Sequence, residues 1–82
     1  MFYTYILRSE FFKQYYIGST TDVERRLSDH NNGNTPSTKP YRPWKLIYTE
    51  TFDTLREARF RERQIKSWKN TAYMINTLGL DS

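Results

Sequence analysis

One helix predicted from the sequence carries an arginine and a histidine on the side that should face a core. Successive residues of a helix are about 100° apart, so Val23, Arg26, Leu27 and His30 share one stripe. Arginine is almost never fully buried without a partner. Arg26 therefore requires an acidic partner, solvent at the edge of a sheet, or an anionic ligand.

The second predicted helix repeats this pattern with the opposite charge. Glu62 shares a face with Leu55, Ala58 and Ile65. An unpaired carboxylate among apolar side chains costs several kcal/mol. Glu62 therefore needs either a partner or a function.

These residues allow two interpretations. In the first, Arg26 and Glu62 form a half-buried ion pair between the helices, and His30 is a satisfied histidine at the edge of the core. In the second, the three side chains meet on one shallow concave face of the sheet and cleave a phosphodiester bond. Arg26 would then neutralise the scissile phosphate, and Glu62 would hold a divalent metal ion.

Two tyrosines in adjacent predicted strands could complete such a site. Alternation along a strand lets Tyr5 and Tyr16 each share a sheet face with a neighbour. A phenol has a pKa near 10, so a tyrosine that orients or deprotonates water would need a metal-bound water or nearby cations. Isolated strand tyrosines are more often structural, and that alternative stays open.

The elements that position these residues follow the order strand, strand, helix, strand, helix, helix. Aromatic and β-branched residues predict strands over residues 2–7, 15–18 and 44–50. The first two strands are close enough in sequence to pair as an antiparallel hairpin. The length of 82 residues then predicts a single α/β domain over residues 1–82.

Each predicted helix has a recognisable start. Two begin with a capping box, in which a threonine precedes a glutamate by three residues, and these pairs are Thr21 with Glu24 and Thr54 with Glu57. The first helix should run from about Asp22 to the Asn31–Gly33 cluster, and the second should reach about Lys69. Asn70 caps a last short helix that Gly79 ends.

Three further positions are candidates for contact with nucleic acid. Residues 34–43 are rich in turn formers and prolines, which predicts a long loop that carries Lys39 and Arg42. Few apolar side chains anchor this region, so we expect residues 31–43 to be the most mobile internal segment. Gly18 would end its strand or let a ligand approach the backbone.

Composition narrows the class of function. The chain has no cysteine and one histidine, which excludes disulfides and argues against a zinc site, so a bound metal would have oxygen ligands. A net charge of +4 suits a polyanionic partner such as nucleic acid. No segment reaches the length of a membrane span, and the first residues lack the order of a signal peptide, so we expect a cytoplasmic protein.

The block from Tyr16 to His30 closely resembles the GIY-YIG nuclease family. Later segments are similar to the small stand-alone branch of that family, often labelled as relatives of the excision-repair incision subunit, and the resemblance covers residues 2–69. The features that carry it are Tyr5, Tyr16-Ile17-Gly18, Ser19-Thr20-Thr21-Asp22, Arg26, Leu27, His30, Pro43-Trp44-Lys45-Leu46 and Glu57-Ala58-Arg59-Phe60-Arg61-Glu62.

The resemblance implies an α+β fold around a small three-stranded antiparallel sheet flanked by helices, in the order ββαβαα. It also implies a nuclease site that uses Mg²⁺ or Mn²⁺. Tyr5 looks like the tyrosine ending the first motif and Tyr16 like the one opening the second, Arg26 and His30 resemble the family's helix residues, and Glu62 resembles its metal-binding glutamate. The first motif reads Tyr3-Thr4-Tyr5 here, so only its tyrosine matches. The family's late asparagine has two candidates, Asn70 and Asn76, between which the spacing does not choose.

We therefore expect a metal-dependent endonuclease that hydrolyses DNA, acting on a branched, damaged or otherwise unusual structure. One alternative is a catalytically weak or inactive nucleic-acid-binding module on the same fold, and another is a structural domain whose polar residues pair with one another. The sequence shows no targeting module, so selectivity would be weak or would depend on a helper protein.

Overall fold

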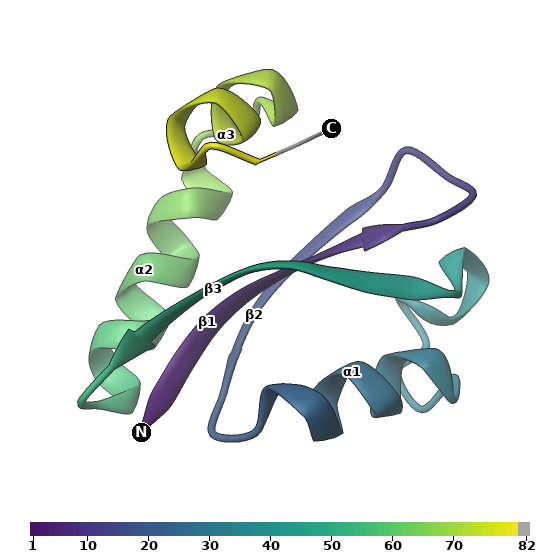
Figure 1. Ribbon diagram of the computed structural model, residues 1–82, viewed down its shortest axis with the longest axis horizontal. Coiled ribbons are helices and arrows are strands. Elements are labelled where there is room, and N and C mark those ends of the chain that lie inside the picture. Colours follow the sequence, from purple (N-terminus) through teal and green to yellow (C-terminus); the bar gives the residue numbers. More distant parts are fainter. Residues whose placement is uncertain (81–82) are drawn as a thin grey trace.

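Three strands form one antiparallel sheet in the order β2-β1-β3. The computed structural model describes residues 1–80, in which β1 is Phe2–Ser9, β2 is Tyr15–Thr20 and β3 is Trp44–Phe52. All three predicted strands are confirmed, and each ends two residues later than predicted. β1 lies in the centre of the sheet, so β2 and β3 are its two edges (Figure 1).

A separate core cluster lies on each face of the sheet, because successive strand residues point to opposite sides. Tyr5 and Leu7 of β1 pack with Trp44 on one face. Ile6, between them in sequence, packs with Ile65 on the other. The central strand therefore contributes to both cores.

The helices divide between these two faces. α1 (Val23–Asn31) packs on the Tyr5 face, whereas α2 (Leu55–Ser67) and α3 (Thr71–Leu78) pack on the Ile6 face (Figure 1). The fold is therefore of the predicted α+β class, with the predicted order ββαβαα and a short 3₁₀ helix, Lys39–Tyr41, before β3. The expectation that both helices carry their charged residues to one face is wrong, because a helical wheel shows which side of a helix is apolar but not which face of the sheet that helix covers.

All three helices begin close to their predicted starts, and two of the three predicted caps are confirmed. The Thr54 side chain accepts a hydrogen bond from the backbone N–H of Glu57, and Asn70 caps α3 in the same way. The capping box of Thr21 and Glu24 is wrong, since Asp22 is the N-cap and accepts from the N–H of Arg25 at 3.1 Å. Threonine and aspartate are both good caps, so only the turn into the helix decides between them.

The C-terminal ends of α2 and α3 fall close to their predicted positions. α2 ends at Ser67, two residues before Lys69. Gly79 ends α3 in the left-handed conformation, with φ of 69°, which glycine adopts without steric cost.

The long loop before β3 is anchored more firmly than expected. Thr38 is buried, and its carbonyl accepts from the indole Nε1–H of Trp44 at 2.9 Å. Asn31 binds both the N–H and the carbonyl of Trp44, and Ser9 donates to the carbonyl of Tyr41 at 2.7 Å. These anchors are polar, and Tyr41 adds an apolar contact with the cluster of Tyr5, Leu7 and Trp44, so the few apolar side chains of the loop do not leave it unattached. Its mobility stays a prediction.

Within residues 1–80, no helix has the length and apolar character needed to cross a membrane.

The helix cap gives the first prediction. Asp22→Ala should lower the free energy of unfolding by about 1 kcal/mol, because the N–H of Arg25 loses its acceptor. Thr21→Ala is the matched control and should change it by less than about 0.5 kcal/mol, since Thr21 is exposed and caps nothing. Urea denaturation of both variants measures the difference, and a larger effect at Thr21 would contradict the assignment of the cap.

Candidate catalytic site beside strand β2

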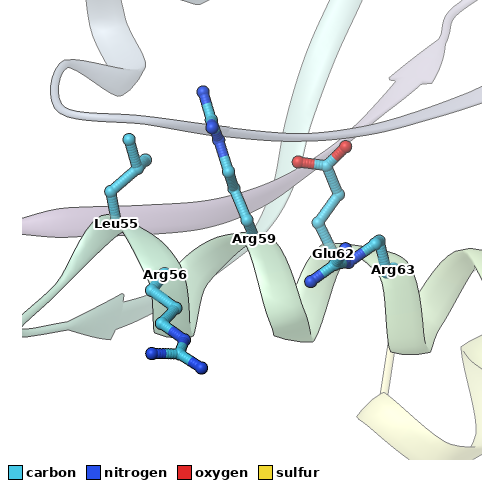
Figure 2. A pocket seen from close by; sticks show the side chains of 5 residues that line it. All are labelled: Leu55, Arg56, Arg59, Glu62 and Arg63. Carbon is cyan, nitrogen blue, oxygen red and sulfur yellow. The ribbon is translucent and has the colours of Figure 1, made fainter.

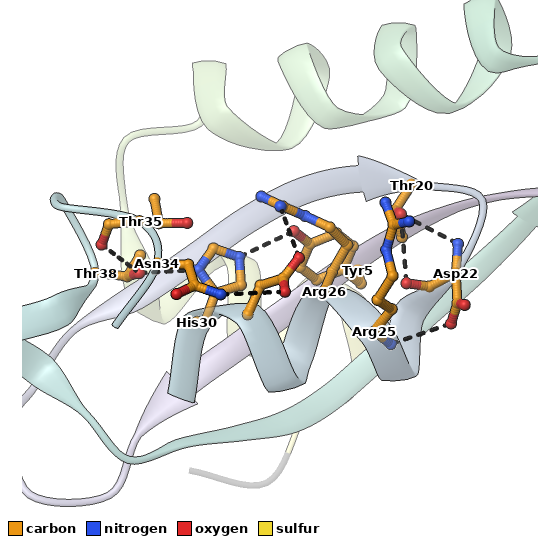
Figure 3. A network of polar contacts seen from close by, with 10 residues as sticks. Tyr5, Thr20, Asp22, Arg25, Arg26, His30, Asn34, Thr35 and Thr38 are labelled. Atoms are coloured by element: carbon orange, nitrogen blue, oxygen red, sulfur yellow. Dashed lines mark hydrogen bonds and ion pairs between the residues drawn. The ribbon is translucent and has the colours of Figure 1, made fainter. Parts of the chain in front are cut away.

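A chain of buried hydrogen bonds joins β1, α1 and the loop before β3. The hydroxyl of Tyr5 lies 3.2 Å from Nε2 of His30, and Nδ1 of His30 lies 2.9 Å from Oγ1 of Thr38. The Thr38 hydroxyl in turn donates to the carbonyl of Thr35 at 3.2 Å (Figure 3). Tyr5, His30 and Thr38 are 1%, 0% and 2% exposed, so no solvent competes for these bonds.

The direction of this chain follows from the single hydrogen on the Thr38 hydroxyl. Because that hydrogen goes to the carbonyl of Thr35, Oγ1 of Thr38 can only accept from His30, which assigns a proton to Nδ1. A neutral imidazole then has a lone pair on Nε2, so Tyr5 donates its hydroxyl proton to His30. Burial lowers the pKa of His30, and the nearby charge of Arg26 lowers it further, so the neutral form is the one that the fold favours.

Gly18 allows Tyr5 to reach this position. A Cβ at Gly18 would lie 2.6 Å from the Tyr5 hydroxyl oxygen and 3.0 Å from Cε2 of Tyr16. Both tyrosine rings therefore pack where any other residue would place its side chain, with ring centroids 6.2 Å apart. The Tyr16 ring also lies 4.5 Å from the ring of His30, centroid to centroid. Packing of the two tyrosine rings thus explains why residue 18 is a glycine. Its expected contact with nucleic acid stays a prediction.

Arg26 lies at the exposed edge of this cluster. Its guanidinium is 3.4 Å from the Asp29 carboxylate, and its side chain is 30% exposed. Burial raises the pKa of Tyr5 to about 12, although hydrogen bonding from Arg26 counteracts this shift. Arg26 therefore has one long ion pair on its own helix and a contact with the phenol, and it remains accessible from solvent.

Glu62 approaches β2 from the opposite layer. Ser19 donates to Oε1 of Glu62 at 2.7 Å, and the Lys66 ammonium donates to Oε2 at 2.6 Å. The interpretation of an Arg26–Glu62 ion pair is therefore wrong, and the partners of Glu62 are Ser19 and Lys66. The other half of that interpretation is confirmed, since both ring nitrogens of His30 have partners.

The two layers meet across two consecutive residues of the edge strand. Gly18 lies under the Tyr5 hydroxyl, and Ser19 holds Glu62. The negative charge of Glu62 also contributes to the raised pKa of Tyr5, so the carboxylate is within electrostatic reach of the phenol. The structure thus gathers five of the predicted site residues around β2, which are Tyr5, Tyr16, Arg26, His30 and Glu62.

Lys39 and Arg42 are not part of this group. With Asn31 and two prolines they line a separate surface cavity of about 580 Å³. Nε of Arg42 donates to the carbonyl of Lys39 at 3.0 Å. The expected binding role of both residues stays a prediction.

The acidic side chains limit which metal could bind. Among residues 1–80, no group of three or more histidine, cysteine, aspartate or glutamate side chains could enclose an ion. A single carboxylate such as that of Glu62 is compatible with Mg²⁺ or Mn²⁺. Hard cations of this kind bind through one or two carboxylates and keep waters and substrate phosphates as their other ligands.

The chain matches the GIY-YIG catalytic domain over residues 1–76. It belongs to the GIY-YIG family. The UPF0213 protein of Staphylococcus saprophyticus is 46% identical to it over 54 residues, which are 65% of this chain and 66% of that protein. The UPF0213 protein of Clostridium perfringens is 42% identical over 67 residues, or 80% and 71% of the two chains. The chain thus spans about two thirds of the length of these relatives.

The chain is also similar to one solved structure. The solution NMR structure of a UPF0213 protein from Bacillus halodurans is 35% identical, with a TM-score of 0.48, and the match covers 82% of this chain and 72% of that one. The names of these relatives state no activity. The family resemblance seen in the sequence is nevertheless confirmed by the GIY-YIG match.

Sequence reasoning does not find three residues that contact the candidate site. Lys66 follows Glu62 by four positions, which is the spacing of a helical ion pair and a recognisable signal. Ser19 belongs to a motif of the sequence, but strand alternation gives no hint that it meets α2. Thr38 carries no signal, because a buried threonine in a loop of turn formers has no periodic pattern.

The buried histidine of the candidate site, His30, gives a prediction of pH dependence. In the unfolded chain an imidazole titrates near pH 6.5, whereas the pKa of His30 is lowered in the fold. As the pH falls below about 6.5, the unfolded state takes up a proton that the folded state does not. The free energy of unfolding should therefore decrease, by up to about 1.4 kcal/mol per pH unit.

Urea denaturation at pH 7.5, 6.5 and 5.5 measures this effect. Stability should be level above pH 6.5, and His30→Gln should remove the decrease below it, because the chain has no other histidine. A wild-type stability that stays constant to pH 5.5 would contradict a buried neutral imidazole.

The contact at Gly18 gives a further prediction. Gly18→Ala should lower the free energy of unfolding by about 1–3 kcal/mol, because the new methyl group overlaps the Tyr5 hydroxyl. Without that contact, alanine would be neutral or stabilising in a strand. The double variant Gly18→Ala with Tyr5→Phe should cost less than the sum of the single changes, because the contact with the hydroxyl at 2.6 Å is gone while that with Cζ at 2.8 Å remains. Simple additivity in thermal and urea unfolding would show that the hydroxyl is not the cause.

Proposed function

We propose that this chain is a metal-dependent endonuclease that hydrolyses phosphodiester bonds in DNA. The observation that supports this most strongly is the arrangement at β2, where an accessible guanidinium and a carboxylate flank the strand from its two faces. Both belong to a GIY-YIG domain. Each of these charges has a partner on its own helix rather than across the sheet, so both are available to a phosphate and its cation.

Exposure separates the roles of the five site residues. Arg26, Tyr16 and Glu62 are partly exposed and can touch a substrate. We assign Arg26 to the charge that develops on the phosphate and Tyr16 to orienting the attacking water. Tyr5 and His30 are covered, and we assign them as positioning residues that act through the contact of Tyr5 with Arg26.

Hydrolysis adds water across the phosphodiester bond. The water oxygen bonds to phosphorus, the bond to the leaving oxygen breaks, and that oxygen takes up a proton. Glu62 would hold Mg²⁺ or Mn²⁺, which supplies charge stabilisation and makes water more acidic. Lys66 now contacts the same carboxylate, but its side chain is 49% exposed and can move away.

A nucleic-acid-binding module without catalysis is the second candidate. It is favoured by one observation, that both oxygens of Glu62 already have partners in Ser19 and Lys66. Incubation with supercoiled plasmid and Mg²⁺ or Mn²⁺, with and without a chelator, separates the two. The nuclease should nick the plasmid only with metal, and the module should shift its mobility without cutting. Branched and damaged duplexes, with and without added cell extract as a source of a helper protein, then test the substrate form.

Glu62→Gln should reduce metal-dependent cleavage by about a hundredfold or more while DNA affinity stays unchanged or rises, because the amide no longer offers an anionic ligand. The free energy of unfolding should change by less than about 1 kcal/mol, since glutamine can still accept from Ser19 and the lost pair with Lys66 is partly exposed. Plasmid nicking, DNA binding and urea denaturation measure the three quantities.

Glu24→Gln provides the matched control for this variant. It removes one exposed negative charge from α1, and its side chain makes no hydrogen bond or ion pair within residues 1–80. It should cleave at the wild-type rate. Wild-type cleavage by Glu62→Gln, or a loss of several kcal/mol in its stability, would defeat the assignment of Glu62.

A further inference from the structure

We propose that three arginines on α2, Arg56, Arg59 and Arg63, bind the phosphate backbone of the DNA strand that reaches Glu62. This inference rests on the proposed function, and it assigns a binding surface that lies apart from Lys39 and Arg42.

The three arginines line one cavity together with Glu62. The cavity has a volume of about 480 Å³, and Leu55 completes its lining (Figure 2). Spacings of three and four residues place Arg56, Arg59 and Arg63 on successive turns of the helix. With about 1.5 Å of rise per residue, the row is about 10 Å long. One strand of duplex DNA presents a phosphate about every 3.4 Å along the axis, so the row matches the scale of a few phosphates.

These arginines differ from the other arginine of α2 in having no acidic partner. Within residues 1–80, none of the three forms an ion pair or a side-chain hydrogen bond. Arg61, by contrast, pairs with Glu50 at 3.0 Å and lies over the ring of Trp68. Like charges at neighbouring helical positions repel one another. A polyanion along the row would relieve this repulsion, whereas Arg61 is already neutralised.

The position of the row explains why the site needs it. The Glu62 carboxylate is paired with Lys66 and offers a phosphate no attraction of its own, so it cannot itself hold the strand. In Figure 2, Arg59 projects from α2 between Leu55 and Glu62, and Arg56 projects to the other side of the helix. The row therefore spreads positive charge over the surface around Glu62, where it can attract a phosphodiester. Charges spread in this way suit an extended polyanion better than a small anion.

Binding measured without divalent metal tests the proposal separately from cleavage. A fluorescently labelled duplex is titrated in EDTA with the wild type, Arg59→Gln, Arg63→Gln and the double variant, between 50 and 200 mM NaCl in about four steps. Each substitution should weaken binding several-fold at the lowest salt. The slope of log K against log salt is negative, and its magnitude should fall by about 0.9 for each lost phosphate contact.

Two controls accompany these variants. Lys45→Gln removes one exposed charge from β3, the opposite edge strand, and should bind within about twofold of the wild type. Arg59→Lys keeps the charge and should retain most of the affinity. In cleavage assays over a range of DNA concentrations, Arg59→Gln should raise KM more than it lowers kcat.

Each possible result bears on the proposal. If Arg59→Gln and Arg63→Gln bind as tightly as Lys45→Gln, the arginine row is not a DNA surface, even if the wild type cuts DNA. If binding depends on the row but no DNA is cut with metal, the binding surface stands and the nuclease proposal fails. If the wild type binds no DNA, or binds an acidic peptide more tightly than DNA, the inference is overturned.

Discussion

A fully buried imidazole lies at the point where three parts of the chain meet. His30 comes from α1, and its two ring nitrogens contact Tyr5 of the central strand and Thr38 of the loop before β3. A charged group in this position would pay a large desolvation penalty, so the ring must be neutral and both nitrogens must be satisfied. This requirement fixes where Tyr5 lies, and the position of Tyr5 in turn requires that residue 18 have no side chain. The cluster on this face of the sheet is built around that constraint.

The edge strand keeps the opposite charges of the site apart. Alternation of side chains along β2 turns Tyr16 toward the face covered by α1, which carries Arg26. It turns Ser19 toward the face covered by α2, which carries Glu62. If arginine and glutamate met directly, they would neutralise each other and leave little attraction for a phosphate or a cation. Each instead has a nearby counter-charge on its own helix, Asp29 and Lys66, in contacts that are partly exposed. Exposed pairs of this kind are weak, so a ligand can replace them at small cost.

Much of the fold could be predicted from the sequence, because strands and helices leave periodic patterns. Arg26, His30 and Glu62 stand out in the sequence as polar residues at apolar places in those patterns, and Tyr5 stands out by the family resemblance. The arrangement of the layers could not be predicted, since periodicity orients a side chain within its helix but does not choose a face of the sheet. The choice of Asp22 over Thr21 as a cap depends on the local turn. The burial of Thr38 depends on hydrogen bonds to residues that are distant in space rather than on its own neighbours.

The hydrogen-bond chain from Tyr5 ends on the backbone carbonyl of Thr35, in the loop before β3. That carbonyl is the reason why Thr38 accepts a hydrogen bond from His30 and why Nδ1 carries the proton. If the Thr38 hydroxyl lost this acceptor, it could donate to Nδ1, and the imidazole could then carry its hydrogen on Nε2 and present it to the phenol oxygen. Tyr5 would change from donor to acceptor toward the ring. The conformation of this loop thereby determines, through a chain of hydrogen bonds, which ring nitrogen of His30 carries the proton.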